Sequence, residues 1–74
     1  MKITVKLFAS FRTGRFVIQE RDYPEGTNVG RVAEDLNLPE KELGIMLVNS
    51  RHVKVGHVLS EGETLALFPL LGGG

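Results

Sequence analysis

The chain has 74 residues and no cysteine, and its nine basic and nine acidic residues give a formal net charge of +0. This length predicts one domain, near the size at which a single hydrophobic core only just suffices, and the 42% apolar content is typical of a globular protein. The missing cysteines exclude disulfides, thiolate zinc sites, cysteine nucleophiles and a ferredoxin-type cluster. The balanced charge gives no general attraction to nucleic acid or to a membrane surface.

The start of the chain alternates charged and apolar side chains, which excludes a secretory signal peptide. No apolar run approaches the roughly twenty residues that span a bilayer. A cytoplasmic location is therefore expected.

Alternating side chains predict two strands at the start of the chain. Residues 2–8 place Ile3, Val5 and Leu7 on one face and lysine or threonine on the other. Residues 9–14 contain Ser, Thr and Gly, as connections do, and residues 15–23 alternate again. The short link between the two strands favours an antiparallel hairpin.

One amphipathic helix is predicted after a turn at residues 24–26. Thr27 or Asn28 supplies the N-cap oxygen, and Pro39 ends the helix near residue 37. Gly30 costs this helix about 1 kcal/mol relative to alanine, which indicates that something packs closely against the first turn. Residues 39–43 can add a short helical turn. The apolar residues at helical spacing are Val29, Val32, Ala33 and Leu36.

The remaining elements are short. Residues 45–49 predict a buried strand, residues 52–55 a further short strand or edge segment, and residues 64–68 the last strand, after a turn at 60–63. The predicted class is α+β, with a mixed sheet of four to five strands and one main helix packed on one face. This element order permits the β-grasp (ubiquitin-like) fold, in which the first and last strands lie parallel at the centre.

The chain ends in an unusual way, because an apolar segment is followed by Gly72, Gly73 and Gly74. Glycines have no side chains to anchor them, and only glycine lets a carboxylate pass down a narrow channel without a clash. Residues 1–68 are therefore expected to form the domain and residues 69–74 a flexible tail. Alternation prevents all the preceding apolar residues from facing the core, so a docking surface for a partner is expected. Its candidates are Phe68, Pro69, Leu70, Leu71 and, as a weaker member, Leu59.

The order and spacing of several motifs resemble the ubiquitin-like sulfur carriers of the MoaD and ThiS type, over essentially the whole chain. The Phe-Pro segment and the Leu-Phe-Ala opening are more similar to MoaD, the small subunit of molybdopterin synthase. The motifs are Lys-Leu-Phe-Ala at 6–9, Pro-Glu-Gly-Thr at 24–27, Val-Asn at 48–49, Leu-Ser-Glu-Gly-Glu at 59–63, and Leu-Phe-Pro at 67–69 before the terminal Gly-Gly.

This resemblance implies a carrier without catalytic activity of its own. An E1-like enzyme of the MoeB or ThiF type would use ATP to adenylate the carboxylate of Gly74, and a persulfide would convert it to a thiocarboxylate. Gly72 would be the small spacer and Gly73 the slim residue before Gly74. The acceptor would be the large subunit of molybdopterin synthase (MoaE type), in molybdenum or tungsten cofactor biosynthesis, and no cofactor would be bound by the carrier. The alternatives are ThiS-like sulfur donation to thiazole synthase or another thiolation pathway, a ubiquitin-like modifier joined to lysines, and a protein-interaction module whose tail has no role.

Other candidate residues have simpler interpretations. His52 and His57 lack further ligands at a metal-binding spacing, so no metal site is expected. The pairs Glu40/Glu42 and Glu61/Glu63 lie in predicted turns without an apolar pocket that would raise a carboxyl pKa. Lys6, Arg12 and Arg51 either form a small basic patch or are scattered surface charges.

Overall fold

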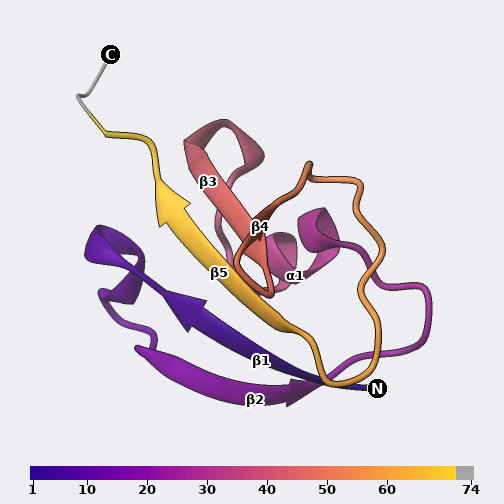
Figure 1. Ribbon diagram of the computed structural model, residues 1–74. Helices are drawn as coiled ribbons and strands as arrows, with labels where there is room; N and C mark the ends of the chain where they lie inside the picture. Colours follow the sequence, from indigo (N-terminus) through magenta and orange to yellow (C-terminus); the bar gives the residue numbers. More distant parts are fainter. Residues whose placement is uncertain (72–74) are drawn as a thin grey trace.

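The computed structural model describes residues 1–71. They form a mixed five-stranded sheet that is covered on one face by helix α1 (Figure 1). The strand order is β2-β1-β5-β3-β4. The strands are β1 (Lys2–Leu7), β2 (Ile18–Asp22), β3 (Leu43–Val48), β4 (Arg51–His52) and β5 (Thr64–Pro69); the helices are α1 (Val29–Asp35) and the 3-10 turns η1 (Ala9–Arg12) and η2 (Glu40–Glu42).

The two central strands come from opposite ends of the sequence. β1 and β5 run parallel, with Thr4 opposite Thr64 and Leu7 opposite Leu67, and their arrows point the same way in Figure 1. β2 pairs antiparallel with β1, and β3 pairs antiparallel with β5. The predicted β-grasp topology and the hairpin of the first two strands are confirmed.

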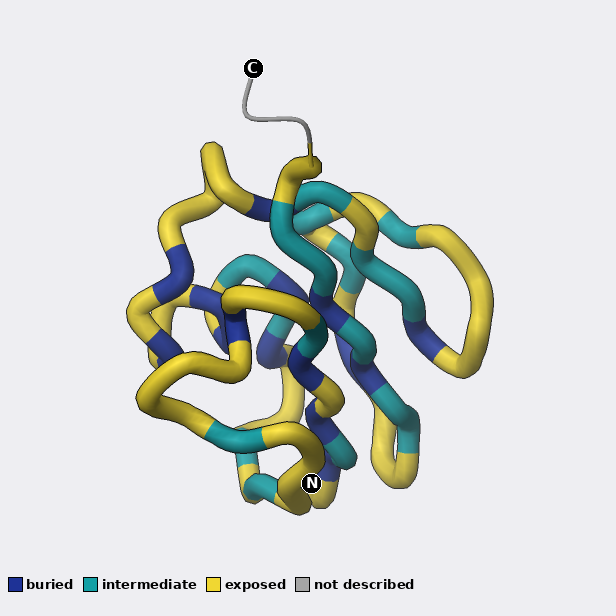
Figure 2. Tube along the Cα trace, turned by 90° about the vertical axis from the view of Figure 1, so that its left-hand side faces the viewer, coloured by how far each residue is buried: buried dark blue, intermediate teal, exposed yellow. Residues whose placement is uncertain are grey.

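The core lies between the sheet and α1. Figure 2 shows buried positions alternating with less buried ones along the central strands, as the period of two requires. The residues that the sequence placed on the inner face of β1 and on one side of α1 are all buried. The buried apolar residues are Ile3, Val5, Leu7, Phe11, Val29, Val32, Ala33, Leu36, Leu38, Leu43, Val48, Leu59, Leu65 and Leu67.

Helix α1 begins as its sequence predicts. The side chain of Asn28 accepts a hydrogen bond of 2.8 Å from the backbone amide of Arg31, which satisfies one of the free N–H groups of the first turn. The amide of Gly30 donates to the carbonyl of Val55 at 2.8 Å, and a Cβ at Gly30 would lie 2.9 Å from Cγ2 of Val55. The predicted close approach to the first turn is therefore confirmed.

Two predicted strands are shorter than expected. β2 begins at Ile18, although the carbonyl of Val17 still accepts a hydrogen bond of 2.9 Å from the amide of Leu7. Arg15, three residues before the strand, is hydrogen-bonded to the end of α1 instead. β4 ends at His52 because the following residues cross to the first turn of α1, where the carbonyls of Val55 and His57 accept from its amides. The helical turn expected within residues 39–43 is present as η2.

Within residues 1–71, no helix has both the length and the apolar character that a membrane span requires.

Candidate functional site

The face of the sheet opposite α1 carries apolar side chains from three adjacent strands. We refer to this surface, formed by Phe8, Ile45, Leu47, Ala66 and Phe68, as the open face. The strand registers bring them together, because Ala66 lies opposite Lys6 and Leu47, and Ile45 lies opposite Phe68. Ile45 is 42% exposed, although most large apolar residues of the domain lie in the core. The other four residues are partly buried, and a contiguous apolar patch of this kind that is open to solvent indicates an interaction surface.

The centre of the open face is an aromatic pair. The rings of Phe8 and Phe68 stack with centroids 4.1 Å apart and planes inclined by 10°. Such a pair contributes about 0.5–1.5 kcal/mol beyond the area that it buries. The two rings border a groove of about 500 Å³. Its other described lining residues are Lys6, Leu47, Asn49, Ser50, Thr64 and Ala66.

Cationic side chains border the aromatic pair. The guanidinium carbon of Arg12 lies 5.2 Å from the centroid of the Phe8 ring, within the range of a cation–π interaction. Lys6 and Arg12 also line a second hollow of about 240 Å³ beside Phe8, with Val17 and Ile18. None of the described residues lining either hollow is acidic. The hypothesised basic patch therefore includes Lys6 and Arg12, whereas Arg51 lines neither hollow.

The end of β5 joins the open face to the predicted tail. Pro69 is the last residue of β5, and the amide of Leu70 donates a hydrogen bond of 3.0 Å to the carbonyl of Glu42. Leu70 and Leu71 are 62% and 82% exposed, whereas Phe68 and Pro69 are partly buried. Gly72, Gly73 and Gly74 lie outside the described residues, so their assigned roles stay predictions, as does the division into residues 1–68 and 69–74.

Leu59 does not belong to this surface. It is 2% exposed and packs in the core, and its amide donates to the carbonyl of Thr27 at 2.9 Å. Its inclusion among the docking residues is wrong, because it lies outside any strand, where alternation does not determine which way a side chain points.

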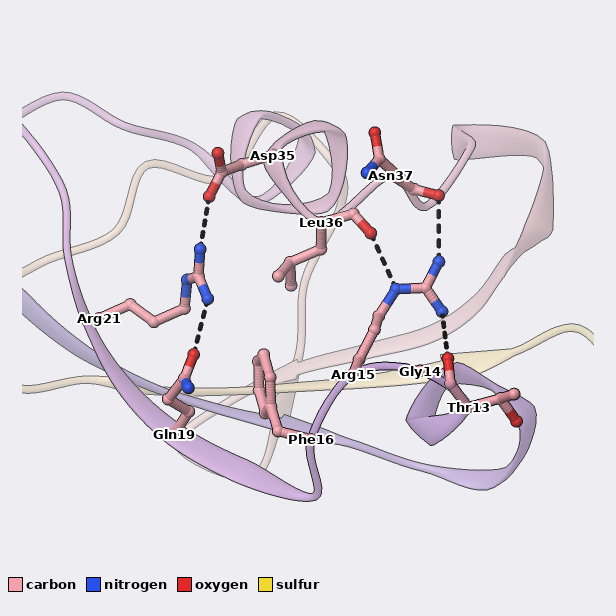
Figure 3. A pocket seen from close by; sticks show the side chains of 9 residues that line it. All are labelled: Thr13, Gly14, Arg15, Phe16, Gln19, Arg21, Asp35, Leu36 and Asn37. Carbon is pink, nitrogen blue, oxygen red and sulfur yellow. Dashed lines mark hydrogen bonds and ion pairs between the residues drawn. The ribbon is translucent and has the colours of Figure 1, made fainter.

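A third hollow, of about 410 Å³, lies between β2 and the end of α1 (Figure 3). Nε of Arg15 donates to the carbonyl of Leu36 at 2.8 Å, and Nη2 donates to the carbonyl of Asn37 at 3.2 Å. Arg15 thus satisfies carbonyls at the helix C-terminus, where a cation is favoured.

Arg21 is paired in the same hollow. It forms a 2.9 Å ion pair with Asp35, and it donates to Gln19 and Tyr23 at 2.6 and 2.9 Å. Burial lowers the pKa of Arg21, but the hydrogen bonds to Tyr23 and Asp35 outweigh it and hold that pKa above its usual value. Burial raises the pKa of the Tyr23 hydroxyl, against the opposing effect of Arg21. Since both arginines have internal acceptors, this hollow is a structural link between β2 and α1.

The histidines and the pair Glu61/Glu63 line neither hollow of the open face. Within residues 1–71, no three His, Asp or Glu side chains form a group that could hold a metal ion. His52 is exposed, and Nε2 of His57 is buried without a hydrogen-bond partner. Glu61 accepts from the amide of Lys2 at 2.9 Å, and Glu63 accepts from the amide of Ser60 at 2.6 Å. These two carboxylates therefore stabilise the turn before β5.

A mixed sheet with parallel first and last strands and one helix across it defines a ubiquitin-like β-grasp protein. The model of the ThiS family matches residues 5–74, and the chain belongs to the ThiS family. Its fold is that of the MoaD- and ThiS-type ubiquitin-like sulfur carriers and modifiers. A search of curated proteins found no match.

Solved structures share this fold. A protein assigned as molybdopterin converting factor, subunit 1, from Pyrococcus furiosus is 27% identical with a TM-score of 0.75, over 93% of this chain and 97% of that one. Small archaeal modifier protein 1 from Haloferax volcanii is 22% identical with a TM-score of 0.73, over 92% of this chain and 95% of that one. A complex of subunits 1 and 2 of molybdopterin-converting factor from Helicobacter pylori contains a chain 15% identical, with a TM-score of 0.66 and full coverage of both chains.

Proposed function

We propose that this protein carries sulfur as a thiocarboxylate on Gly74 and donates it in molybdopterin biosynthesis. The observation that carries the proposal is the continuity between the open face and the chain end: Phe68 lies at its centre, and Leu70 and Leu71 follow it with most of their surface exposed. A partner that covers the open face would thereby receive the terminal glycines at its own active site. Membership of the ThiS family supports this arrangement.

The chemistry needs an activated terminus, because a carboxylate is a poor acyl donor. An E1-like enzyme would let the Gly74 carboxylate attack the α-phosphorus of ATP, so that pyrophosphate leaves and an acyl adenylate forms. The terminal sulfur of a persulfide then displaces AMP, and a partner thiol cleaves the resulting S–S bond to leave the thiocarboxylate and a disulfide. The sulfur must come from outside, because the chain has no cysteine. The carrier contributes reach and position, and the partners contribute the reacting side chains.

The molybdopterin pathway is favoured by two of the structural relatives. One is assigned as subunit 1 of a molybdopterin converting factor, and another is subunit 1 in complex with subunit 2. We therefore propose the large subunit of molybdopterin synthase as the sulfur acceptor, docking on the open face. Donation to thiazole synthase is the second candidate, since the matching family model is that of ThiS. Conjugation to lysines is the third, because small archaeal modifier protein 1 has the same fold.

A reconstitution test separates these candidates. The thiocarboxylated chain would be mixed with the large subunit of molybdopterin synthase and its pterin precursor, and separately with thiazole synthase and its substrates. We expect sulfur to leave the chain only in the first mixture, with the chain lacking Gly74 as the inactive control. Transfer only to thiazole synthase would overturn the pathway assignment. Lysine-linked adducts on a denaturing gel, without sulfur transfer in either mixture, would favour the modifier function.

A further inference from the structure

Gly44, in β3, lies against the backbone at the end of β5. A Cβ on Gly44 would lie 2.6 Å from the carbonyl oxygen of Pro69, 2.8 Å from its carbonyl carbon and 2.9 Å from the nitrogen of Leu70. All three are main-chain atoms, so no side-chain rotation relieves the overlap. Gly44 does not have a positive φ, so close approach is the reason for a glycine at this position.

The two residues that precede Gly44 hold the end of β5 by backbone contacts. Leu43 pairs with Pro69, and the carbonyl of Glu42 accepts from the Leu70 amide at 3.0 Å. The strand register shifts between Leu43 and Ile45, which is the irregularity expected of a bulge. The backbone is therefore held one residue beyond the end of β5, and Gly44 provides the space in which it is held.

The held segment leaves the sheet at a defined place. Pro69 and Leu70 border a hollow of about 350 Å³ between η1 and η2, whose other described lining residues are Ser10, Phe11, Lys41 and Glu42. The predicted tail thus starts from a fixed point relative to Phe68 and the open face. By contrast, Leu71 is 82% exposed.

We propose that Gly44 is a positioning residue, which fixes the point and direction in which the chain leaves the sheet toward its terminal carboxylate. This inference rests on the proposed carrier function. Four residues follow Leu70, and they span at most about 14 Å at 3.3–3.6 Å per residue. With so short a reach, a displaced starting point moves the carboxylate out of attack position, and an error of about 1 Å can cost about a hundredfold in rate.

The kinetic test compares Gly44→Ala with Gly56→Ala. The second variant is the matched control, because a Cβ at Gly56 meets nothing within 4 Å. With the activating enzyme, ATP and a sulfur donor, we expect Gly44→Ala to lower kcat for thiocarboxylate formation by about tenfold or more. We expect KM to stay within about twofold of the wild type, since no side chain of the open face is replaced. Equal kcat values for the two variants would overturn the inference.

Amide hydrogen exchange gives a readout that does not depend on activity. In the wild type, the Leu70 amide should exchange slowly and the Leu71 amide quickly, and Gly44→Ala should remove the protection of Leu70 while that of β1 persists. The wild-type measurement remains decisive if Gly44→Ala does not fold. A Leu70 amide that exchanges as fast as that of Leu71 would overturn the inference. If the wild-type chain forms no thiocarboxylate at all, the proposed carrier function is wrong. If Gly44→Ala and Gly56→Ala form it at equal rates, only the role of Gly44 is wrong.

Discussion

Phe8 and Phe68 are the residues on which the docking proposal depends most. Phe8 directly follows β1 and Phe68 lies near the end of β5, and together they place a stacked aromatic pair on the face that α1 leaves uncovered. In a protein interface, a few such anchors carry most of the binding free energy. Loss of one ring should therefore weaken binding more than it weakens the fold.

Phe68→Ala should raise KM for the activating enzyme by at least about tenfold, because it removes one ring of the pair. The matched control is Val58→Ala, which shortens an apolar side chain that is 54% exposed and lines neither hollow of the open face. Steady-state kinetics of both variants, with urea unfolding to establish that each is folded, give the comparison. An unchanged KM for Phe68→Ala would contradict the docking role of the open face.

At the scale of elements, the first turn of α1 is set by one side chain. Asn28→Ala removes the acceptor for the Arg31 amide and should lower the free energy of unfolding by about 1 kcal/mol. Asn28→Asp keeps a capping oxygen and should stay within a few tenths of a kcal/mol of the wild type. Urea unfolding of the three proteins measures the difference. Equal losses for both variants would show that the cap contributes nothing.

The link between β2 and α1 predicts a dependence of stability on pH. The pKa of Tyr23 is raised above 10.0 in the folded chain, chiefly by burial, so the unfolded chain loses this proton first as the pH rises. The stabilisation from the protonated hydroxyl is therefore complete below about pH 10 and is lost as the pH rises through the folded-state pKa. Tyr23→Phe has no such proton. Above pH 10, the free energy of unfolding should therefore fall more for the wild type than for this variant. Urea unfolding at pH 8 and pH 11 tests this, and parallel changes in both proteins would contradict it.

Much of the element pattern is readable from the sequence because local rules determine it. Ile3, Val5 and Leu7 specify β1 by alternation, and Asn28 specifies the start of α1 by its capping side chain. The start of β2 is not readable in this way, because Arg15 bonds to the end of α1, 21 or 22 positions further along the chain. No local pattern contains such a contact.

At the scale of the whole molecule, the sequence predicts Phe68 as a docking residue but does not predict the other residues of the open face. Leu47 is an apolar residue on the outward side of β3, and Phe8 directly follows β1. Only the pairing of these two strands with β5 brings the two residues beside Phe68. The signal that would have found them is an apolar residue at the outer positions of three central strands at once. Gly44 was missed for the same reason, since its neighbour Pro69 is brought to it by pairing across the sheet.

The expected division into a folded domain and a terminal tail predicts the effect of truncation on the whole chain. Removal of Gly72, Gly73 and Gly74 should leave Tm unchanged within error, because glycines add no side chain to the core and β5 ends at Pro69. Calorimetry of the full and truncated chains measures this. A large drop in Tm would show that the terminal glycines belong to the folded domain.

The central claim is that Gly74 carries the sulfur, and intact mass spectrometry tests it most directly. The chain would be incubated with an E1-like activating enzyme, ATP and a persulfide donor, beside the same chain without Gly74. We expect the full chain to gain the mass of one oxygen-to-sulfur exchange, localised to its last residue by fragmentation, and the truncated chain to stay unchanged. An unchanged full chain, or sulfur gained equally by the truncated chain, would contradict the claim.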